Sequence, residues 1–211
     1  MKDIVIIGAG GFGREVQWLI DEINQVNNIW NFLGYIDDKI SVGTILNDYP
    51  VVGDLNWLKS QSLYVVCAIG DPNVKKKVLE QLIESENKYP VLVHPDVRMS
   101  KFIHIGEGTI ICSGCILTVN INIGKHVIIN LNSTVGHDAT IGNYSTILPS
   151  VNISGHVSIH ELVSVGTGTK IIQELTIGRN TIIGAGAIVT NNIPDNVVAV
   201  GMPARAIKIR E

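Results

Sequence analysis

The sequence of 211 residues has little cysteine, no surplus of basic residues and no long apolar run. Its three cysteines cannot supply a disulfide framework and are typical of a reducing compartment, so we expect a cytoplasmic protein. A net charge of −3 without a basic stretch argues against nucleic acid as a partner. No apolar run approaches the roughly 20 residues of a membrane span, and the first residues lead directly into a predicted strand, so we expect neither a membrane span nor a signal peptide.

A hexad repeat dominates the second part of the sequence. From residue 93 to residue 189, every sixth residue is aliphatic. A period of six fits neither a helix nor a single strand, and it predicts a repeat of one short strand and a corner. Small or apolar residues stand four positions after the aliphatic ones, from Thr109 to Ala187, and strand alternation lets both positions share one interior. The aliphatic series is Val93, Met99, Ile105, Ile111, Leu117, Ile123, Ile129, Val135, Ile141, Ile147, Ile153, Ile159, Val165, Ile171, Ile177, Ile183 and Val189.

Ile-Gly pairs set the size of the larger unit. They occur at residues 105–106, 123–124, 141–142 and 177–178, so successive pairs are three hexads or twice three hexads apart. Three hexads therefore make one turn of a coil with three flat sides, and stacked coils pair as parallel strands, which predicts a parallel β-helix. Glycine and asparagine at the corners predict a backbone with positive φ there. These corner residues are Gly106, Asn130, Asn132, Gly142, Gly166 and Gly184.

Residues 1–92 lack the hexad repeat and alternate predicted strands with predicted helices. The predicted strands are residues 4–7, 31–36 and 63–69, and the predicted helices are residues 14–26 and 73–86. This alternation indicates a small parallel sheet covered by helices. We therefore expect two domains, an α/β domain at residues 1–92 and a β-helix with a C-terminal tail at residues 93–211.

A glycine-rich turn follows the first predicted strand. Gly8, Gly10 and Gly13 match the dinucleotide fingerprint, in which backbone N–H groups at a helix N-terminus approach a phosphate. A dinucleotide site needs two mononucleotide halves, and this domain has room for one. We therefore favour a nucleotide-sugar site over an NAD site or a purely structural turn. Asp37 and Asp38 follow the second predicted strand, at the sheet edge where such folds bind ligands, so we expect them to contact the ligand. The alternative is that they only begin a turn.

Two of the six histidines and a pair of cysteines are expected to have structural or linker roles, and a third histidine is expected in solvent. His94 and His104 fall at the start of the repeat, and His126 falls at a corner where we expect it to be exposed to solvent. Cys112 and Cys115 have the CxxC spacing of a metal site. Only Cys115 takes an inward position of the repeat, however, so the two thiols are predicted to point in different directions.

His137 is the candidate catalytic histidine. It lies at a corner directly before Asp138, and the register of three hexads stacks Gly155 on His137 and His156 on Asp138. A neutral imidazole beside a carboxylate can act as a general base near pH 7. The group that orients the imidazole is either Asp138 itself or a neighbouring group.

Four motifs together resemble one family: Gly8-Ala-Gly-Gly-Phe-Gly13, Ile36-Asp-Asp38, Val135-Gly-His-Asp-Ala-Thr-Ile-Gly142 and Gly201-Met-Pro-Ala204. It is the family of bacterial sugar acetyltransferases typified by PglD, which N-acetylates a UDP-amino sugar, and NeuD, which O-acetylates sialic acid. The resemblance covers nearly the whole chain. It implies a nucleotide-sugar domain followed by a left-handed β-helix, homotrimers, and acetyl-CoA bound between adjacent subunits, with no metal.

The resemblance also implies roles for single residues. His137 matches the catalytic base of the family and Asp138 its acidic neighbour, whereas Thr146 stands where PglD has a second histidine near the acetyl group. Contacts with acetyl-CoA are implied for Gly155, whose N–H meets the acetyl carbonyl, and for Thr167, Ala185 and Thr146. Contacts with the nucleotide sugar are implied for Gly10, Gly11, Phe12, Asp37, Asp38 and Gly70.

The predicted function is direct acetyl transfer from acetyl-CoA to the amine of a UDP-linked 4-amino-dideoxy sugar for bacterial surface glycans. The alternative within the family is O-acetylation of a sugar or of sialic acid. Carbonic anhydrases of the γ class share the prism and bind zinc, but the spacing of His126, His137, His156 and His160 does not repeat their close histidine pair. A scaffold or ice-binding prism would need regular Thr-x-Thr rows on one face, which this sequence lacks. A nicotinamide oxidoreductase is supported only by the glycine turn, so both functions are disfavoured.

Overall fold

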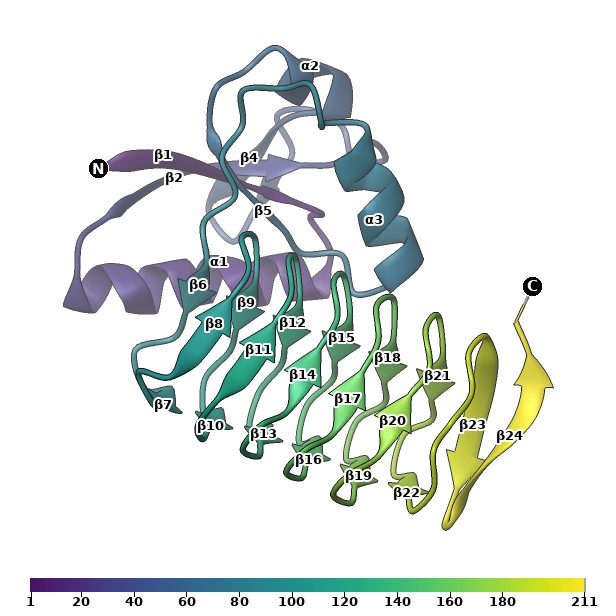
Figure 1. Ribbon diagram of the computed structural model, residues 1–211. Coiled ribbons are helices and arrows are strands. Elements are labelled where there is room, and N and C mark those ends of the chain that lie inside the picture. The colour runs from purple at the N-terminus through teal and green to yellow at the C-terminus, as the bar shows by residue number, and fades with distance from the viewer. Residues whose placement is uncertain (211) are drawn as a thin grey trace. The chain divides into compact units, whose positions relative to one another are not determined.

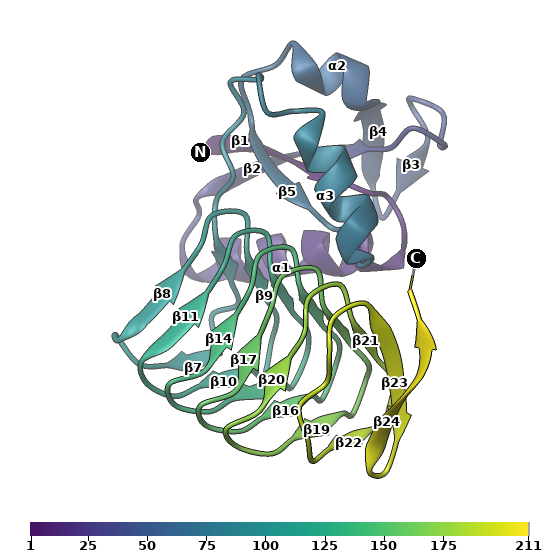
Figure 2. The same cartoon turned by 45° about the vertical axis from the view of Figure 1, so that its right-hand side comes forward.

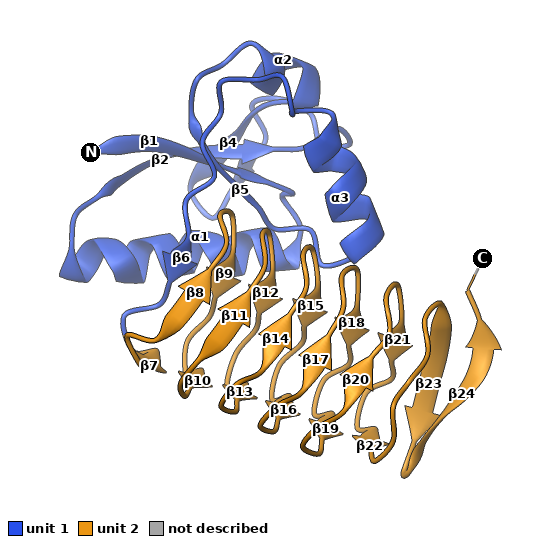
Figure 3. Cartoon of the chain, viewed as in Figure 1, with its two compact units in different colours: residues 1–95 blue, residues 96–211 orange. Residues whose placement is uncertain are grey.

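The structure is a computed structural model that describes residues 1–210 and divides into two compact units. Unit 1 comprises residues 1–95 and unit 2 comprises residues 96–211 (Figure 3). The division lies close to Val93, where the hexad repeat begins.

Unit 1 is a five-stranded sheet with helices, in the strand order β3-β4-β2-β1-β5 (Figures 1 and 2, with β3 labelled in Figure 2). The strands are β1 (Lys2–Ile7), β2 (Trp30–Ile36), β3 (Ile45–Leu46), β4 (Tyr49–Gly53) and β5 (Tyr64–Cys67), and the helices are α1 (Gly11–Val26), α2 (Leu55–Lys59) and α3 (Pro72–Glu80). All strand pairs are parallel except β3 with β4. The short strand β6 (Leu92–Val93) precedes unit 2. The predicted small α/β fold is confirmed.

The buried face of α1 and the start of α3 can be explained from the sequence. In α1, Val16, Leu19 and Ile20 share one face and are buried. The carboxylate of Asp71 caps α3 by accepting from two backbone N–H groups at 2.9 Å. The prediction that this helix extends to residue 86 is wrong. After Glu80 the backbone bonds close over three residues, as from Leu82 to Leu79, so the segment continues as tight turns.

Unit 2 is a three-sided solenoid whose faces are parallel sheets. The first face holds β7 (Arg98–Met99), β10 (Ile116–Leu117), β13 (Thr134–Val135), β16 (Asn152–Ile153), β19 (Lys170–Ile171) and β22 (Ile188–Val189). The second face holds β8 (Ile103–Ile105), β11 (Ile121–Ile123), β14 (Thr140–Ile141), β17 (Ser158–Ile159) and β20 (Thr176–Ile177). The third face holds β9 (Ile110–Ile111), β12 (Ile128–Ile129), β15 (Thr146–Ile147), β18 (Ser164–Val165), β21 (Ile182–Ile183), β23 (Val197–Gly201) and β24 (Ala204–Ile209).

The chain visits the three faces in turn and returns to each after three hexads. Thr134 of β13, for example, pairs with Ile116 of β10 and Asn152 of β16. The coil winds in the left-handed sense, as the path from β10 through β11 to β12 shows in Figures 1 and 2. We call the corner after the first face the first edge, the corner after the second face the second edge, and the corner after the third face the third edge.

The aliphatic series forms the interior of the solenoid. Each of its members in unit 2 ends a strand, and all members from Ile111 to Val189 are buried. Met99, in the first coil, is 47% exposed. The positions four residues later are buried too, apart from the half-buried Leu175. Their hydroxyl groups donate to backbone carbonyls, as Ser133 does to Leu148 at 3.2 Å, which makes these polar side chains compatible with the core.

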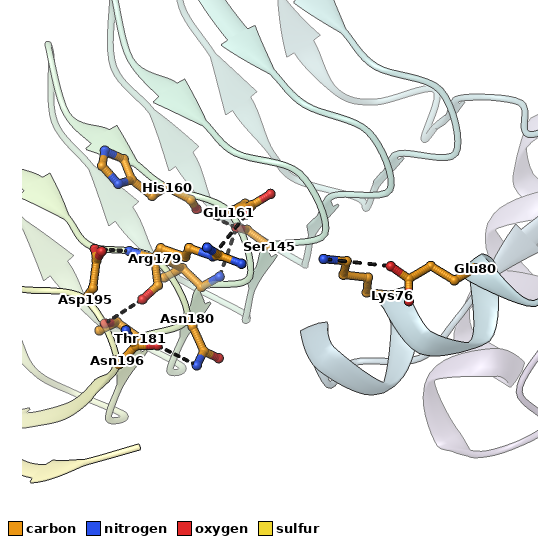
Figure 4. Close-up of polar contacts among 11 residues, drawn as sticks. Lys76, Glu80, Ser145, His160, Glu161, Arg179, Asn180, Thr181, Asp195 and Asn196 are labelled. Atoms are coloured by element: carbon orange, nitrogen blue, oxygen red, sulfur yellow. Dashed lines mark hydrogen bonds and ion pairs between the residues drawn. The ribbon is translucent and has the colours of Figure 1, made fainter. Parts of the chain in front are cut away.

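Polar bonds also join neighbouring coils along the second edge (Figure 4). The hydroxyl of Ser145 donates to the carbonyl of His160 at 3.0 Å, and the ion pair of Glu161 with Arg179 spans 3.1 Å. The backbone N–H of Arg179 donates to the carboxylate of Asp195 at 2.7 Å. These bonds connect the coils in the direction of stacking.

The prediction of positive φ at the corner glycines is wrong for most positions. Of the six corner residues, only Asn132 has positive φ, at +57°. Gly106, Gly142, Gly166 and Gly184 are required for a different reason, since a Cβ atom there would lie 2.4 to 2.7 Å from atoms of the next coil. The left-handed residues stand two positions further on, at every sixth position: Gly108, Gly114, Asn120, His126, Asn132, Asp138, Tyr144, Ser150, His156, Leu162, Gly168, Glu174, Asn180 and Gly186.

The C-terminal tail continues the third face. Strand β23 pairs with β21 in parallel, and β24 pairs with β23 in the antiparallel sense as the last strand of the sheet. Among the described residues, no helix is long and apolar enough to cross a membrane.

Candidate active site

The first edge carries the predicted base and its acid. His137 and Asp138 lie between β13 and β14, and Nδ1 of His137 is 2.8 Å from Oδ2 of Asp138. One coil earlier, Nδ2 of Asn120 donates to Oδ1 of Asp138 at 3.2 Å. Asp138 itself therefore pairs with the imidazole, and a second hydrogen bond holds the carboxylate from the other side. Asn120 was not among the predicted site residues, although its place three hexads before Asp138 points to it.

Gly155, one coil after His137, leaves room for the imidazole. A Cβ atom at position 155 would lie 2.6 Å from both Cε1 and Nε2 of His137. The predicted stacking of these two residues is confirmed. Any side chain at position 155 would push the imidazole away, so the glycine preserves the position of the imidazole.

The environment favours an ionised Asp138 and one tautomer of His137. Hydrogen bonds from His137 and then from Asn120 hold the pKa of the Asp138 carboxyl below its ordinary value. With Nδ1 facing an ionised carboxylate, the neutral imidazole carries its proton on Nδ1 and leaves Nε2 as an acceptor. The side chains of His137 and Asp138 are 56% and 37% exposed, so a substrate can reach the pair.

A second histidine joins this cluster. Nε2 of His156 is 3.6 Å from Oδ2 of Asp138, and its ring meets that of His137 edge to face with the centroids 5.1 Å apart. The predicted stacking of His156 on Asp138 is confirmed. His156 was not predicted to have a role at this site, because stacking alone does not show that its nitrogen faces the carboxylate.

The other residues implied for acetyl-CoA lie elsewhere on the solenoid. Thr167 and Ala185 are exposed and lie on the third edge, where the N–H of Gly186 donates to the carbonyl of Thr167 at 2.8 Å. Thr146 lies in β15 on the third face and is 1% exposed. Within one chain, the first face separates the edge of His137 from the edge of Thr167 and Ala185.

Unit 1 has a cavity of about 310 Å³ at the carboxyl ends of its central strands. The cavity is lined by Ile7, Gly8, Ile36, Asp37, Asp38, Lys39, Leu55, Ile69, Val74 and Val78. Oδ2 of Asp37 accepts from the N–H of Ala9 at 3.0 Å, which ties β2 to the glycine turn. Oδ1 of Asp38 accepts from the N–H of Leu55 at 3.0 Å. Both carboxylates thus shape the loops around the cavity besides lining it.

The glycines of unit 1 differ in their surroundings. A Cβ atom at Gly10, Gly11 or Gly70 would meet nothing within 4 Å, so these positions are open. A Cβ atom at Gly13 would lie 1.9 Å from the carbonyl oxygen of Gly8, which makes Gly13 a packing requirement. Phe12 follows Gly11 in the first turn of α1. The open glycines are therefore the ones available to a phosphate.

The remaining histidines and cysteines do not form a site of their own among residues 1–210. The prediction that His126 is exposed to solvent is wrong. Its ring stacks on that of Tyr144 with the centroids 5.6 Å apart and is buried, because both residues occupy left-handed corner positions in successive coils. His126 and His160 lie on the second edge, away from His137 and His156 on the first. All three cysteines are buried and unbridged.

Comparisons with known proteins agree with this architecture. Residues 3–82 match the family model described as the PglD N-terminal domain. The chain is 32% identical to GDP-perosamine N-acetyltransferase of Escherichia coli O157:H7 over 199 residues. This alignment covers 93% of this chain and 81% of that protein. The chain is also 33% identical over 107 residues to galactoside O-acetyltransferase of Lactococcus lactis subsp. lactis (strain IL1403). That alignment covers 49% of this chain and about half (51%) of the relative.

The crystal structure of PerB from Caulobacter crescentus in complex with CoA and GDP-perosamine is similar over nearly the whole chain. The TM-score is 0.87 at 30% sequence identity, and the match covers 99% of this chain and 98% of that one.

Proposed function

Because the chain belongs to the PglD-type family of bacterial sugar acetyltransferases, we propose that it transfers an acetyl group from acetyl-CoA to the amine of a nucleotide-linked amino-dideoxy sugar. The observation that carries this proposal is the pair of His137 and Asp138 on an open edge of the solenoid. The product would serve the synthesis of bacterial surface glycans. Resemblance to PglD favours UDP as the carrier. The names of the similar proteins include both carriers, GDP-perosamine in two of them and UDP-N-acetylbacillosamine in a third.

In the proposed reaction, His137 is the general base. As the amine attacks the thioester carbonyl carbon, Nε2 of His137 takes a proton from the amine. The C–S bond then breaks, and the thiolate of coenzyme A takes the proton from the imidazolium and leaves as the thiol. Asp138 holds the imidazole in the correct tautomer and stabilises the imidazolium that forms. General base catalysis typically contributes about 10²- to 10⁴-fold, and one backbone donor to the oxyanion, such as the N–H of Gly155, contributes roughly 3 kcal/mol.

No covalent acetyl-enzyme is needed. Ser133 and Ser145 are fully buried in the solenoid interior, where their hydroxyls donate to backbone carbonyls at 3.2 Å and 3.0 Å. Burial also raises the pKa of the Cys115 thiol to about 11, which keeps it in the unreactive thiol form. These inward side chains cannot act as nucleophiles, so direct transfer between two bound substrates fits the chain best.

The placement of the acetyl-CoA residues supports a homotrimer. His137 and Gly155 lie on the first edge, whereas Thr167 and Ala185 lie on the third edge of the same chain. An acetyl-CoA molecule that contacts all four residues therefore requires the first edge of one copy and the third edge of another. Closed rotational symmetry with three copies satisfies this requirement for each chain. Sedimentation of the purified protein as a trimer is the expected result.

The nucleotide would bind in unit 1. The exposed glycines at the start of α1 offer backbone N–H groups and the positive end of a helix to a phosphate. The cavity beside them combines the carboxylates of Asp37 and Asp38 with apolar walls, a lining that suits the hydroxyl groups and the ring of a nucleoside.

The decisive experiment compares acceptors in an assay of thiol release from acetyl-CoA. UDP-, GDP- and dTDP-linked 4-amino-4,6-dideoxy sugars are each offered alongside the same nucleotide sugars with a hydroxyl group in place of the amine. We expect release with at least one amino sugar and not with its hydroxyl counterpart. If only the hydroxyl compounds or sialic acid are turned over, the alternative function, O-acetylation, is favoured. The similarity to galactoside O-acetyltransferase over half its length is the observation that supports this alternative. Absence of turnover with every acceptor would overturn the proposal.

A further inference from the structure

The first edge holds more metal-binding groups than a general base needs. His137, Asp138 and His156 each offer one ligand atom, and these atoms all lie within 4.8 Å of one another. Asp138 Oδ2 is the common partner, at 2.8 Å from Nδ1 of His137 and 3.6 Å from Nε2 of His156. Asp138 and His156 both have left-handed backbones, with φ of +59° and +57°, so successive coils present them in the same way.

Two of the three distances between these atoms are close to those around a bound metal ion, and the distance between the two histidine nitrogens is within 4.8 Å. Zinc binds nitrogen and oxygen ligands at about 2.0 to 2.2 Å, so two ligands of a tetrahedral site lie roughly 3.4 Å apart. The two measured distances, 2.8 Å and 3.6 Å, lie on either side of this value. All three side chains are exposed, so rotation about their own side-chain bonds can complete the geometry without a change in the backbone.

We propose that His137, Asp138 and His156 form an inhibitory site for a divalent transition metal ion such as Zn²⁺. Two imidazoles and one carboxylate select zinc, nickel or copper over magnesium and calcium, which prefer oxygen ligands. The fourth position is left for water. Such a metal is not a resident cofactor of the proposed reaction.

Metal binding at this site would inactivate the base through its tautomer. The nitrogen of His137 that faces Asp138 is Nδ1. A metal ion on Nδ1 leaves the proton of the neutral ring on Nε2, the atom that must accept the proton from the amine. The ion would also take the carboxylate of Asp138 away from the imidazole. This consequence for activity rests on the proposed function, whereas metal binding itself does not.

His156 distinguishes this site from an ordinary surface pair. Without it, His137 and Asp138 supply two adjacent ligands, which hold a metal ion weakly. Replacement of His156 by asparagine suits the backbone, because asparagine tolerates positive φ and occupies equivalent corners at positions 120, 132 and 180. The hydrogen bond between His137 and Asp138 does not involve His156, so His156→Asn removes the third ligand and leaves the base in place.

The test is calorimetric titration of the 211-residue protein with ZnCl₂, after dialysis against a chelator has removed bound metal. We expect one site per chain, at least tenfold weaker binding in His156→Asn, and unchanged binding in the control His160→Asn, whose histidine lies on the second edge. MgCl₂ should give no site. The three cysteines are buried and cannot supply a competing surface site. Equal affinity of the wild type and His156→Asn, or a zinc Kd weaker than about 100 μM in the wild type, would overturn the proposal.

Inhibition is measured separately by chromatography of the acetylated product, because the thiol of coenzyme A itself binds zinc. Zinc should inhibit the wild type over the range in which it binds, and His156→Asn should need at least tenfold more zinc. Calorimetric binding at His156 without inhibition would reject the inhibitory role. If the wild type acetylates no acceptor, the proposed function fails, whereas the calorimetry still decides whether the metal site exists.

Discussion

In unit 2, the surroundings of a residue repeat with every coil, whereas in unit 1 each residue has surroundings of its own. The glycines illustrate the difference. Gly142 and Gly166, at equivalent positions of different hexads, would both clash with the next coil if they carried a Cβ atom. Gly10 and Gly13 are close together in one motif, yet the first is open and the second is packed against Gly8. Register thus predicts the role of a residue in the solenoid, and only tertiary contacts do so in the α/β unit.

The largest expected effect is the loss of activity when His137, at one corner of the repeat, is replaced. His137→Ala should lower kcat by at least about 10²-fold, or about 2.7 kcal/mol in activation free energy, because the amine loses its base. The affinity for acetyl-CoA should change little. Steady-state kinetics and calorimetry of coenzyme A binding check the two parts. Near-normal turnover would show that this corner is an ordinary member of the repeat.

A side chain at Gly13 should be the most damaging small change in unit 1. Gly13→Ala places Cβ 1.9 Å from the carbonyl oxygen of Gly8, so α1 must move away from the glycine turn. We expect a loss of about 3 kcal/mol in the free energy of unfolding, measured by urea denaturation. Gly10→Ala is the matched control, since its Cβ meets nothing, and it should affect only the KM for the nucleotide sugar. Equal stability of the two variants would contradict the difference between these glycines.

The corresponding change in unit 2 should be slightly milder. In Gly142→Ala, Cβ would lie 2.5 Å from the backbone nitrogen of Glu161, so two coils must separate locally at a cost of about 1 to 3 kcal/mol. The control is Gly168→Asn, at a corner with φ of +73° and open space around Cβ, which should stay within about 0.5 kcal/mol of the wild type. Thermal unfolding of both variants tests whether register predicts tolerance.

The smallest expected effect is a pH dependence that comes from a buried lysine of unit 1. Lys75 in α3 is fully buried, and burial lowers its pKa from 10.5 to about 7. Between these values the unfolded chain binds more protons than the folded chain, so the free energy of unfolding rises with pH. Burial raises the pKa of Cys67 to about 11, which acts in the opposite direction above pH 9. The rise should therefore appear between pH 7 and pH 9, at roughly 1 kcal/mol per pH unit.

Lys75→Met should abolish this slope, and Lys76→Met, at a partly exposed neighbour, should retain it. Urea denaturation at pH 7, 8 and 9 provides the measurement. An identical slope in Lys75→Met and the wild type would assign the pH dependence to other groups.

Sequence reasoning worked best where the repeat controls the structure. The aliphatic series, the coil of three hexads and the stacking of Gly155 on His137 all follow from register. It failed where local preference competes with contacts between coils. Corner glycines suggested positive φ, but close approach of the next coil requires them, and the residues that do have positive φ include Tyr144 and Leu162. His126 was expected in solvent, but the ring of Tyr144 covers it.

The amino-acid sequence by itself determined the period, the coil and the face to which each side chain of unit 2 belongs, because a hexad repeat allows a single registry of buried aliphatic residues. Tertiary structure alone decided which polar atoms meet across coils. Asn120 and His156 face the carboxylate of Asp138, and Thr146 is buried on the third face, away from His137 on the first edge. The physical reason is that hydrogen bonds and metal sites depend on distances of a few tenths of an ångström, which side-chain rotation sets and periodicity does not.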